Sequence, residues 1–297
     1  MTWETDLSRV DVYRAAREAM PFLMVGPVTW DVFEDDSRLP GGPVSFAART
    51  VAALGARAHI LTGGAEDASL TALAGHTVHT VKGLSTESWG IYNSGSGRRR
   101  LRLIERLGRM LGPDDLVGGW PEPRNLFLAP LIPDDVDVLS FLDRFSSAAA
   151  WVLGQGLQRQ VDDEGFVYHP AEPTELLLNC LSPRVTLFLS SDEIASWSRE
   201  AIEEVAGRCR QFVITKGSEG LEIKTSGDTY NVGAVSAQVV DTTGAGDAFN
   251  AGFAAALTEN QGIKEAIAFA SATAGLSTTK IGTANSMPSR EEIDKIL

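Results

Sequence analysis

Short apolar runs alternate along most of this chain with longer stretches in which apolar residues recur every three or four positions. The runs have the length of buried strands, and the recurring positions have the spacing of helices with one apolar face. Strands that alternate with helices form a mostly parallel sheet wrapped by those helices, so the pattern predicts an α/β fold. The runs predict strands at residues 22–26 with a continuation through 27–31, and at 57–62, 76–81, 126–129, 149–154, 185–189 and 212–215.

Helices are predicted where the apolar positions are periodic and the ends carry suitable residues. Residues 1–20 have the pattern of an amphipathic helix that packs outside the main sheet. A second helix begins at Pro43, which the first helical turn tolerates, and ends at Gly55. A third is predicted at about 66–74. Because the chain has no internal repeat or low-complexity tract, we predict a single domain over residues 1–297.

Residues 88–103 depart from this alternation. Two apolar stretches flank a turn rich in glycine and serine, which is typical of a β-hairpin. We predict a hairpin over about residues 86–104 that projects from the core and covers a cleft, with an ordinary surface hairpin as the alternative. Its second strand is basic, and Arg98, Arg99 and Arg100 begin that run. The run is either a solvated edge or the source of one arginine, such as Arg98, that points into the cleft.

Charge and composition exclude several classes of partner. The formal net charge is −13, which argues against nucleic acid because a phosphate backbone needs a basic face. No apolar run has the length of a membrane span, and no signal segment opens the chain, so we expect no membrane contact. Cys180 and Cys209 have neither metal-ligand spacing nor a disulfide pattern. We expect buried free thiols and a cytoplasmic location.

The most informative stretch covers residues 239–253. An apolar run ends at Asp241, a glycine-rich turn follows, and a helix with one apolar face begins. Unpaired amides and the dipole at such a helix N-terminus can hold an anion, and Gly244 and Gly246 allow a phosphoryl group to approach the backbone. Asp247 lies in the first turn, where it could accept the proton of a hydroxyl that attacks phosphorus. The alternative role of Asp247 is to complement the helix dipole.

This string, D-T-T-G-A-G-D-x-F, resembles the signature of the ribokinase-like (PfkB) carbohydrate kinases. In that family the last aspartate is the catalytic base and the Gly-Ala-Gly amides form an anion hole. The resemblance therefore assigns the base to Asp247 and the anion hole to Gly244, Ala245 and Gly246. It also implies a three-layer α/β/α fold with a mostly parallel central sheet and a small β-hairpin lid.

Other stretches resemble the family in the same order, over about residues 22–297. Asp31 matches an aspartate that binds substrate hydroxyls, and Gly42 and Ser45 match the glycine pair and the helix start that orient the acceptor. The turn at 215–220 resembles the nucleotide-side T-x-G-x-x-G motif. The resemblance assigns nucleotide contacts there to Thr215, Lys216, Gly217 and Gly220. The alternative role of Lys216 is structural, as a residue that only caps the edge of a strand. Residues 266–282 resemble the C-terminal helix pair that flanks adenine.

The chain also departs from the common pattern of the family. Phe46 stands where an asparagine is usual, and the Asn-x-x-Glu motif linked to Mg²⁺ keeps only its acid, Glu193. Glu193 could equally belong to an acidic helix N-terminus. Nine residues separate Asp31 from Gly41, too few for long lid strands. These departures resemble the inositol-kinase branch.

The resemblance implies an ATP-dependent kinase that phosphorylates a hydroxyl of a small sugar or polyol, inositol-like acceptors included. Its implied cofactors are ATP and Mg²⁺, with K⁺ beside Asp241 and Thr243 as in many members. The expected partners are ATP and the acceptor, and the expected assembly is a monomer or homodimer. The alternatives are a nucleoside kinase of the same family and a ligand-binding homologue without turnover. A nicotinamide-dependent dehydrogenase is disfavoured, since no G-x-G-x-x-G follows the first strand.

Overall fold

The computed structural model describes residues 22–93, 99–235, 237–259, 261–281 and 287–297. Within these ranges the longest sheet consists of β1 Phe22–Val25, β4 Ala58–Gly63, β5 Thr77–Val81, β8 Asn125–Leu128, β9 Ala149–Leu153, β12 Val185–Ser190, β13 Gln211–Thr215, β14 Leu221–Lys224 and β15 Thr229–Val232. Its strand order is β15-β14-β13-β12-β9-β8-β1-β4-β5. The strands from β13 to β5 pair in parallel, and β14 and β15 are antiparallel. The predicted mostly parallel sheet is confirmed.

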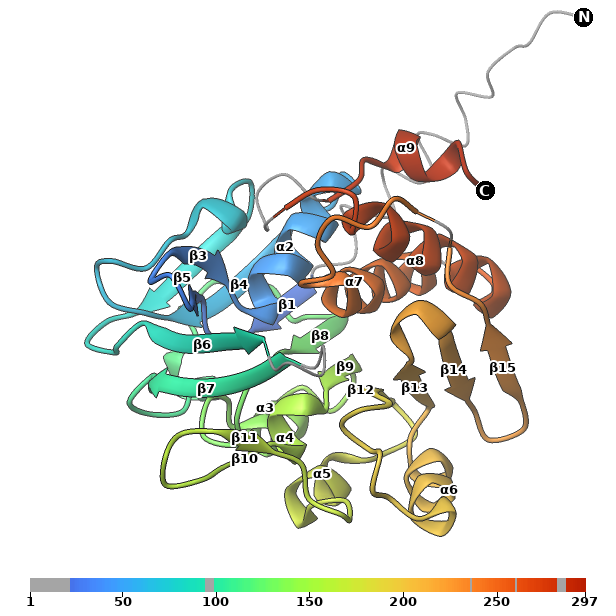
Figure 1. Ribbon diagram of the computed structural model, residues 1–297, viewed down its shortest axis with the longest axis horizontal. Coiled ribbons are helices and arrows are strands. Elements are labelled where there is room, and N and C mark those ends of the chain that lie inside the picture. The colour runs from blue at the N-terminus through green and yellow to red at the C-terminus, as the bar shows by residue number, and fades with distance from the viewer. Residues whose placement is uncertain (1–21, 94–98, 236, 260, 282–286) are drawn as a thin grey trace, which may run out of the picture.

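Helices cover both faces of this sheet, so the fold has three layers (Figure 1). One face carries α2 Pro43–Ala53, α7 Ala245–Thr258 and α8 Ile263–Ser277, and the other carries α3 Val138–Arg144, α4 Gln155–Gln158, α5 Glu175–Cys180 and α6 Arg199–Arg208. The short α9 Arg290–Asp294 packs on α8. Neighbouring strand residues point to opposite faces, which is why Met24 joins one core and Val25 the other.

Helix α7 is held on the sheet by an aromatic cluster. Phe253 is fully buried, and its ring meets Trp151 of β9 and Phe188 of β12 edge-on, at centroid distances of 6.4 and 6.5 Å. Phe249, one turn earlier on the helix, stacks on Phe253 at 5.8 Å. The N-terminus of α7, where the glycine-rich turn lies, is therefore anchored to two central strands.

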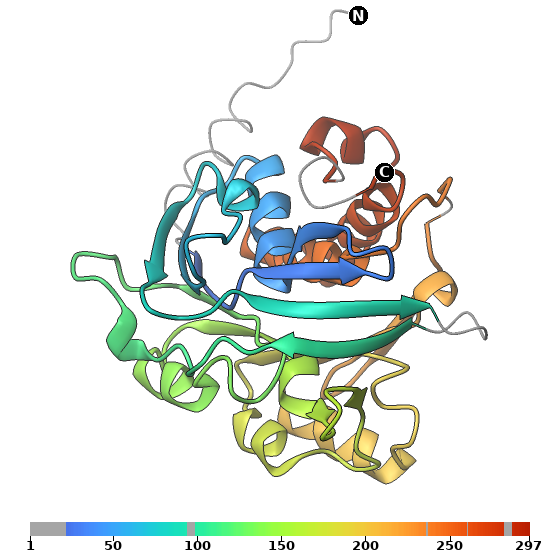
Figure 2. The same cartoon turned by 60° about the vertical axis from the view of Figure 1, so that its left-hand side comes forward.

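A second sheet forms the lid. It consists of β2 Thr29–Phe33, β3 Arg38–Gly41, β6 Glu87–Asn93 and β7 Arg99–Glu105, in the order β3-β2-β6-β7. Strands β6 and β7 are antiparallel, so the predicted hairpin is confirmed. Figure 2 shows that the lid is larger than a hairpin, because β2 and β3 run beside it. The short connection before Gly41 has room for these two short strands and a turn in which Asp36 has a φ of 61°.

Several local expectations were wrong. The helix predicted at 66–74 is reduced to one 3-10 turn, η1 Thr71–Leu73. Thr86 holds this segment instead, since its hydroxyl accepts from the Ala65 amide at 3.0 Å and donates to Asp67 at 2.7 Å. The first strand does not run through residue 31, because the chain leaves β1 and enters the lid at Thr29. The predicted helix at residues 1–20 lies outside the described residues.

Two further expectations concern cysteines and membranes. Cys180 and Cys209 are buried and free, as predicted. Burial raises the pKa of each thiol to about 12, so neither is a reactive thiolate at neutral pH. Among the helices that the structure describes, none is long and apolar enough to cross a membrane.

Candidate active site

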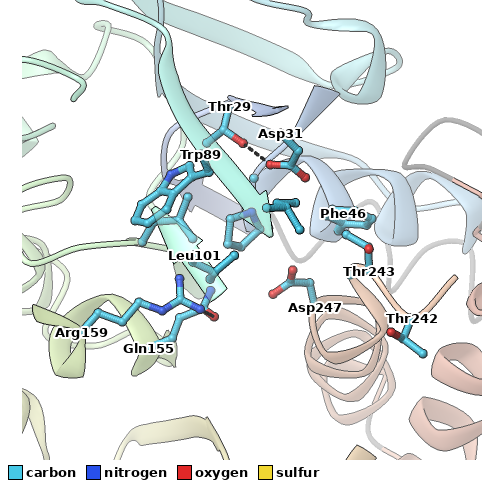
Figure 3. Close-up of a pocket in the computed structure, with 15 residues that line it drawn as sticks. Thr29, Asp31, Phe46, Trp89, Leu101, Gln155, Arg159, Thr242, Thr243 and Asp247 are labelled. Carbon is cyan, nitrogen blue, oxygen red and sulfur yellow. Dashed lines mark hydrogen bonds between the residues drawn. The ribbon is translucent and has the colours of Figure 1, made fainter. Parts of the chain in front are cut away.

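A cavity of about 270 Å³ lies between the lid and the N-terminus of α7 (Figure 3). The lid contributes one wall and the starts of α2 and α7 another, while α4 closes a third side. The residues that line it are Thr29, Asp31, Gly42, Pro43, Phe46, Trp89, Ile91, Leu101, Leu131, Gln155, Arg159, Thr242, Thr243, Gly244 and Asp247.

The turn before α7 depends on glycine at its N-cap. Gly244 has a φ of 74°, in the left-handed region that favours glycine, and a Cβ there would overlap the ring of Phe46. Above Gly246 the space is open, because no atom lies within 4 Å of the position that its Cβ would take. The Ala245 amide donates to the Thr242 carbonyl at 3.2 Å. Helix geometry leaves the amides of Gly246 and Asp247 for a ligand.

Asp247 faces the cavity from the first turn of α7 (Figure 3). Burial raises the pKa of its carboxyl to about 7, the Arg159 charge opposes this rise, and the charges of Glu193 and Asp31 add to it. A general base works best when its pKa lies near the working pH, because it is then both ionised and basic. Asp247 therefore presents a carboxyl group with a raised pKa to the cavity, at the N-terminus of α7.

Asp31 projects from lid strand β2 into the same cavity (Figure 3). Its Oδ1 accepts a hydrogen bond from the Thr29 hydroxyl at 3.3 Å. Its carboxylate packs against Gly41, where a Cβ would overlap the carboxylate atoms. Gly42 caps α2 with a φ of 90°, and a Cβ there would lie 2.7 Å from the Pro27 carbonyl oxygen. The glycine pair therefore lets the lid and α2 meet closely enough to position Asp31.

Some residues predicted for the acceptor site are not on its wall. Ser45 is buried inside α2, and its hydroxyl has no hydrogen-bond partner among the described residues. Arg98 lies outside the described residues. Arg100 is exposed, and its guanidinium carbon lies 4.1 Å from the centre of the Phe166 ring. Arg102 donates to the Glu164 carbonyl at 2.8 Å. Arg100 and Arg102 thus hold the outer side of the lid.

The residues predicted for the nucleotide form a separate turn. Thr215 ends β13, Lys216 and Gly217 follow it, and Gly220 closes the turn with a φ of 94°. The Lys216 ammonium donates to Glu222 at 2.7 Å, and its amide donates to the Gly220 carbonyl at 2.8 Å. This turn does not line the cavity, so its predicted contacts with nucleotide stay a prediction.

Glu193 lies in the turn that follows β12, so the helix N-terminus expected for it was wrong, as α6 begins only at Arg199. Its Oε2 accepts from the Ser190 amide at 2.8 Å. The Ser191 amide of the same turn donates to the Thr215 carbonyl at 2.8 Å. Glu193 is therefore buried between the cavity and the turn at 215–220.

Asp241 and Thr243 shape the loop that enters α7. The Thr243 amide donates to Asp241 Oδ1 at 2.9 Å, and the Asp241 amide donates to the Thr278 carbonyl at 3.0 Å. The described ranges contain no group of three or more acidic, histidine or cysteine side chains that could hold a metal ion. Carbonyls of this loop, rather than a carboxylate cage, are the donor type that suits K⁺.

Sequence reasoning missed Arg159 and Gln155. Both follow β9 at the carboxyl end of the parallel sheet, where ligands of such folds bind. Arg159 Nη2 donates to Gln155 Oε1 at 3.0 Å and lies 3.4 Å from Glu193 Oε1. The position of Arg159 shortly after the strand predicted at 149–154 is the sequence signal that could have identified it.

Comparisons with known proteins show which families and folds this chain resembles. The model of the "pfkB family carbohydrate kinase" matches residues 156–290. A ribokinase of Arabidopsis thaliana is 29% identical over 94% of this chain and 81% of its own length. A ribokinase of Bacillus subtilis is 39% identical over 29% of this chain, and the match spans only 30% of that relative's length.

The fold is also similar to that of solved ribokinase structures. The structure of Arabidopsis thaliana ribokinase complexed with ribose and ATP superposes with a TM-score of 0.69 at 21% identity, over 93% of this chain and 98% of that one. The signature at Asp247, the three-layer fold, the family model and the Arabidopsis relative all point to the same group of kinases. The chain is similar to the ribokinase-like, or PfkB, carbohydrate kinases in its sequence, over residues 156–290 for the family model, and it shares their fold.

Proposed function

We propose that this protein transfers the γ-phosphoryl group of ATP to a hydroxyl of a small sugar or polyol, with inositol-like ring polyols among the candidates. The observation that carries this proposal is the pairing of Asp247 with Asp31 across one cavity, at the anion-binding start of a helix. The volume of about 270 Å³ suits an acceptor of sugar size, at the lower end of small-molecule sites.

Asp247 is the general base of the proposed reaction. Its carboxylate accepts the proton of the acceptor hydroxyl while that oxygen bonds to phosphorus. With a pKa of about 7, a large share of Asp247 is ionised at neutral pH, yet it is more basic than an ordinary aspartate. The Gly244–Ala245–Gly246 turn offers amides and the positive end of α7 to the charge on the transferred group.

Asp31 and the lid orient the acceptor. The Asp31 carboxylate accepts hydrogen bonds from acceptor hydroxyls, and the Gly42 backbone approaches the ring closely. Trp89 and Leu101 of the lid lie over the cavity and exclude water, a competing nucleophile. Fixed orientation of this kind can supply several kcal/mol of the barrier reduction.

The donor binds on the far side of the α7 turn. We assign nucleotide contacts to Thr215, Lys216, Gly217 and Gly220. Bound Mg²⁺ would supply positive charge that offsets the charge of the phosphates. Glu193, a buried carboxylate, would orient a water of that ion, and the loop at Asp241 and Thr243 would offer a place for K⁺. Neither metal role requires a cage of protein carboxylates.

Asp247→Asn tests the proposal. Asparagine is nearly isosteric but cannot accept the hydroxyl proton, so turnover should fall roughly a hundred- to ten-thousand-fold. Affinity for a non-hydrolysable ATP analogue, measured by calorimetry, should be retained, because the turn and the dipole remain. Asp143→Asn, at an exposed position of α3, is the matched control and should keep full turnover.

The assay uses a panel of inositols, hexoses, pentoses and nucleosides. Turnover on nucleosides alone would favour a nucleoside kinase, and binding without turnover on any acceptor would favour a ligand-binding homologue. Near-normal turnover of Asp247→Asn would contradict the assignment of the base.

A further inference from the structure

Arg159 is a buried cation in the wall of the cavity. It caps the C-terminal end of α4 and is 8% exposed, yet it lines the cavity. Figure 3 shows its side chain extending toward the cavity beside Gln155, on the opposite side from Thr242 and Thr243. The acceptor half of the cavity thus contains a charge that a neutral sugar does not need.

The protein leaves the hydrogen bonds of this guanidinium incomplete. Among the described residues, both contacts come from Nη2, to Gln155 Oε1 at 3.0 Å and to Glu193 Oε1 at 3.4 Å. Nε is buried and has no partner. A guanidinium carries five N–H donors, and burying it without acceptors costs free energy.

The ion pair with Glu193 does not account for Arg159 by itself. Its single contact of 3.4 Å is longer than an ordinary charge-assisted hydrogen bond and is not the two-bond fork of a strong arginine–carboxylate pair. Glu193 also directs its other oxygen to the Ser190 amide. One face of Arg159 therefore stays available to a further oxyanion.

The rest of the cavity divides into two regions. Asp31 and Asp247 form a region that accepts hydrogen bonds from hydroxyls. The lining also includes the apolar side chains of Trp89, Leu101 and Leu131. A molecule that fills the cavity therefore meets hydroxyl-binding carboxylates, apolar side chains and one cation.

We propose that the acceptor carries an oxyanion group that Arg159 binds, so that the substrate is a hydroxylated acid rather than a neutral sugar. This inference rests on the proposed function. Arg159 is the one cation among the described residues that line the cavity, so a singly charged carboxylate is balanced better than a phosphate monoester. Both are oxyanions that an arginine fork recognises.

The test compares acidic and neutral acceptors of similar size. Gluconate represents a carboxylate, glucose 6-phosphate represents a phosphate, and glucose and myo-inositol are the neutral probes. Each is titrated by calorimetry without nucleotide and assayed with Mg²⁺ and ATP, for the wild type, Arg159→Gln and Arg159→Lys. Arg208→Gln is the matched control, since Arg208 lies on the exposed face of α6.

Arg159→Gln should weaken binding of the preferred acid, and raise its KM, roughly ten- to hundred-fold, the usual effect of losing a charged hydrogen-bond partner. Binding of the neutral probes should change less than about threefold. Arg159→Lys keeps a charge beside Glu193 and so guards against a folding defect. It should bind the acid with intermediate affinity because it lacks the fork.

Preference of the wild type for gluconate or for glucose 6-phosphate supports the oxyanion site and identifies its source. An equal fall in kcat for acidic and neutral acceptors would overturn the proposal, because it would place Arg159 on the transferred phosphoryl group. Efficient phosphorylation of neutral probes with no binding of acids would also overturn it while the proposed kinase stands. Arg159-dependent binding of an acid without phosphorylation would retain this site and contradict the kinase.

Discussion

At the scale of single residues, the protonation state of Asp247 is subject to two opposing effects. Catalysis of the proposed kind needs an ionised carboxylate, whereas burial favours the protonated form and raises the pKa to about 7. Arg159 partly compensates by favouring the charged form. The site thus retains a base at neutral pH at some cost to the stability of the folded chain.

This cost predicts a stabilised variant. The pKa of Asp247 is about 7 in the folded chain and near 3.8 when unfolded, so the folded state binds the proton more tightly. Stability from this group is fully present below pH 3.8 and is lost as the pH rises through 7. Asp247→Asn should therefore be more stable than the wild type at pH 8, by about 1–3 kcal/mol after allowance for solvent screening.

Urea unfolding of both proteins at pH 8 and at pH 4.5 measures this difference, which should be several-fold smaller at the lower pH. A carboxylate that only complements the helix dipole gives the opposite sign, a loss of about 0.3–1 kcal/mol on substitution. Lower stability of Asp247→Asn at pH 8 would therefore contradict the buried-base interpretation.

At the scale of elements, the contact between β2 and β3 determines where Asp31 points. Gly41→Ala places a methyl group against the Asp31 carboxylate, and this short side chain must rotate away. The KM for the acceptor should rise roughly tenfold, the effect of one lost hydrogen bond to a charged group, while ATP-analogue affinity stays unchanged. Gly118→Ala is the control, because its Cβ would meet no atom within 4 Å.

Steady-state kinetics with each substrate varied in turn separates the two affinities. An unchanged acceptor KM in Gly41→Ala, together with normal folding by circular dichroism, would show that Asp31 does not orient the acceptor.

The elements differ in how well the sequence predicts them. Buried parallel strands such as β1, β8 and β12 are apolar on both faces, so a short hydrophobic run identifies them. The lid strands β2 and β3 are half exposed, and their partner β6 comes much later in the chain. Local pattern cannot show such pairing, so only the β6–β7 hairpin was predicted.

The site residues also differ in whether the local sequence can predict them. Asp247 and Gly244 belong to one continuous string, whose residue types and spacing state their chemistry. Arg159 reaches the cavity only because β9 and α4 bring it there, and its partner Glu193 is 34 positions later in the chain. The failed helix at 66–74 has a similar cause, since Thr86 of a distant segment holds that backbone.

At the scale of the whole molecule, the site and the core share one helix. The N-terminus of α7 forms the cavity floor, while its middle packs between α2, α8 and the sheet. Net charge contributes little to this arrangement, because residues such as Phe253 and Trp151 act by burial and not by charge. The position of Asp247 should therefore depend on core packing about two turns away.

Phe253→Ala tests this dependence. Removing a fully buried ring that contacts Trp151, Phe188 and Phe249 should lower the free energy of unfolding by about 3–5 kcal/mol. Because the cavity it leaves lies beneath α7, kcat should also fall at temperatures where the variant is still folded. Ile296→Ala, at a side chain that is 48% exposed, is the control and should change neither quantity appreciably. Urea unfolding gives the stability, and turnover at 10 °C is measured on the folded fraction. Full turnover in a destabilised Phe253→Ala would show that Asp247 is positioned by the N-terminal turn alone.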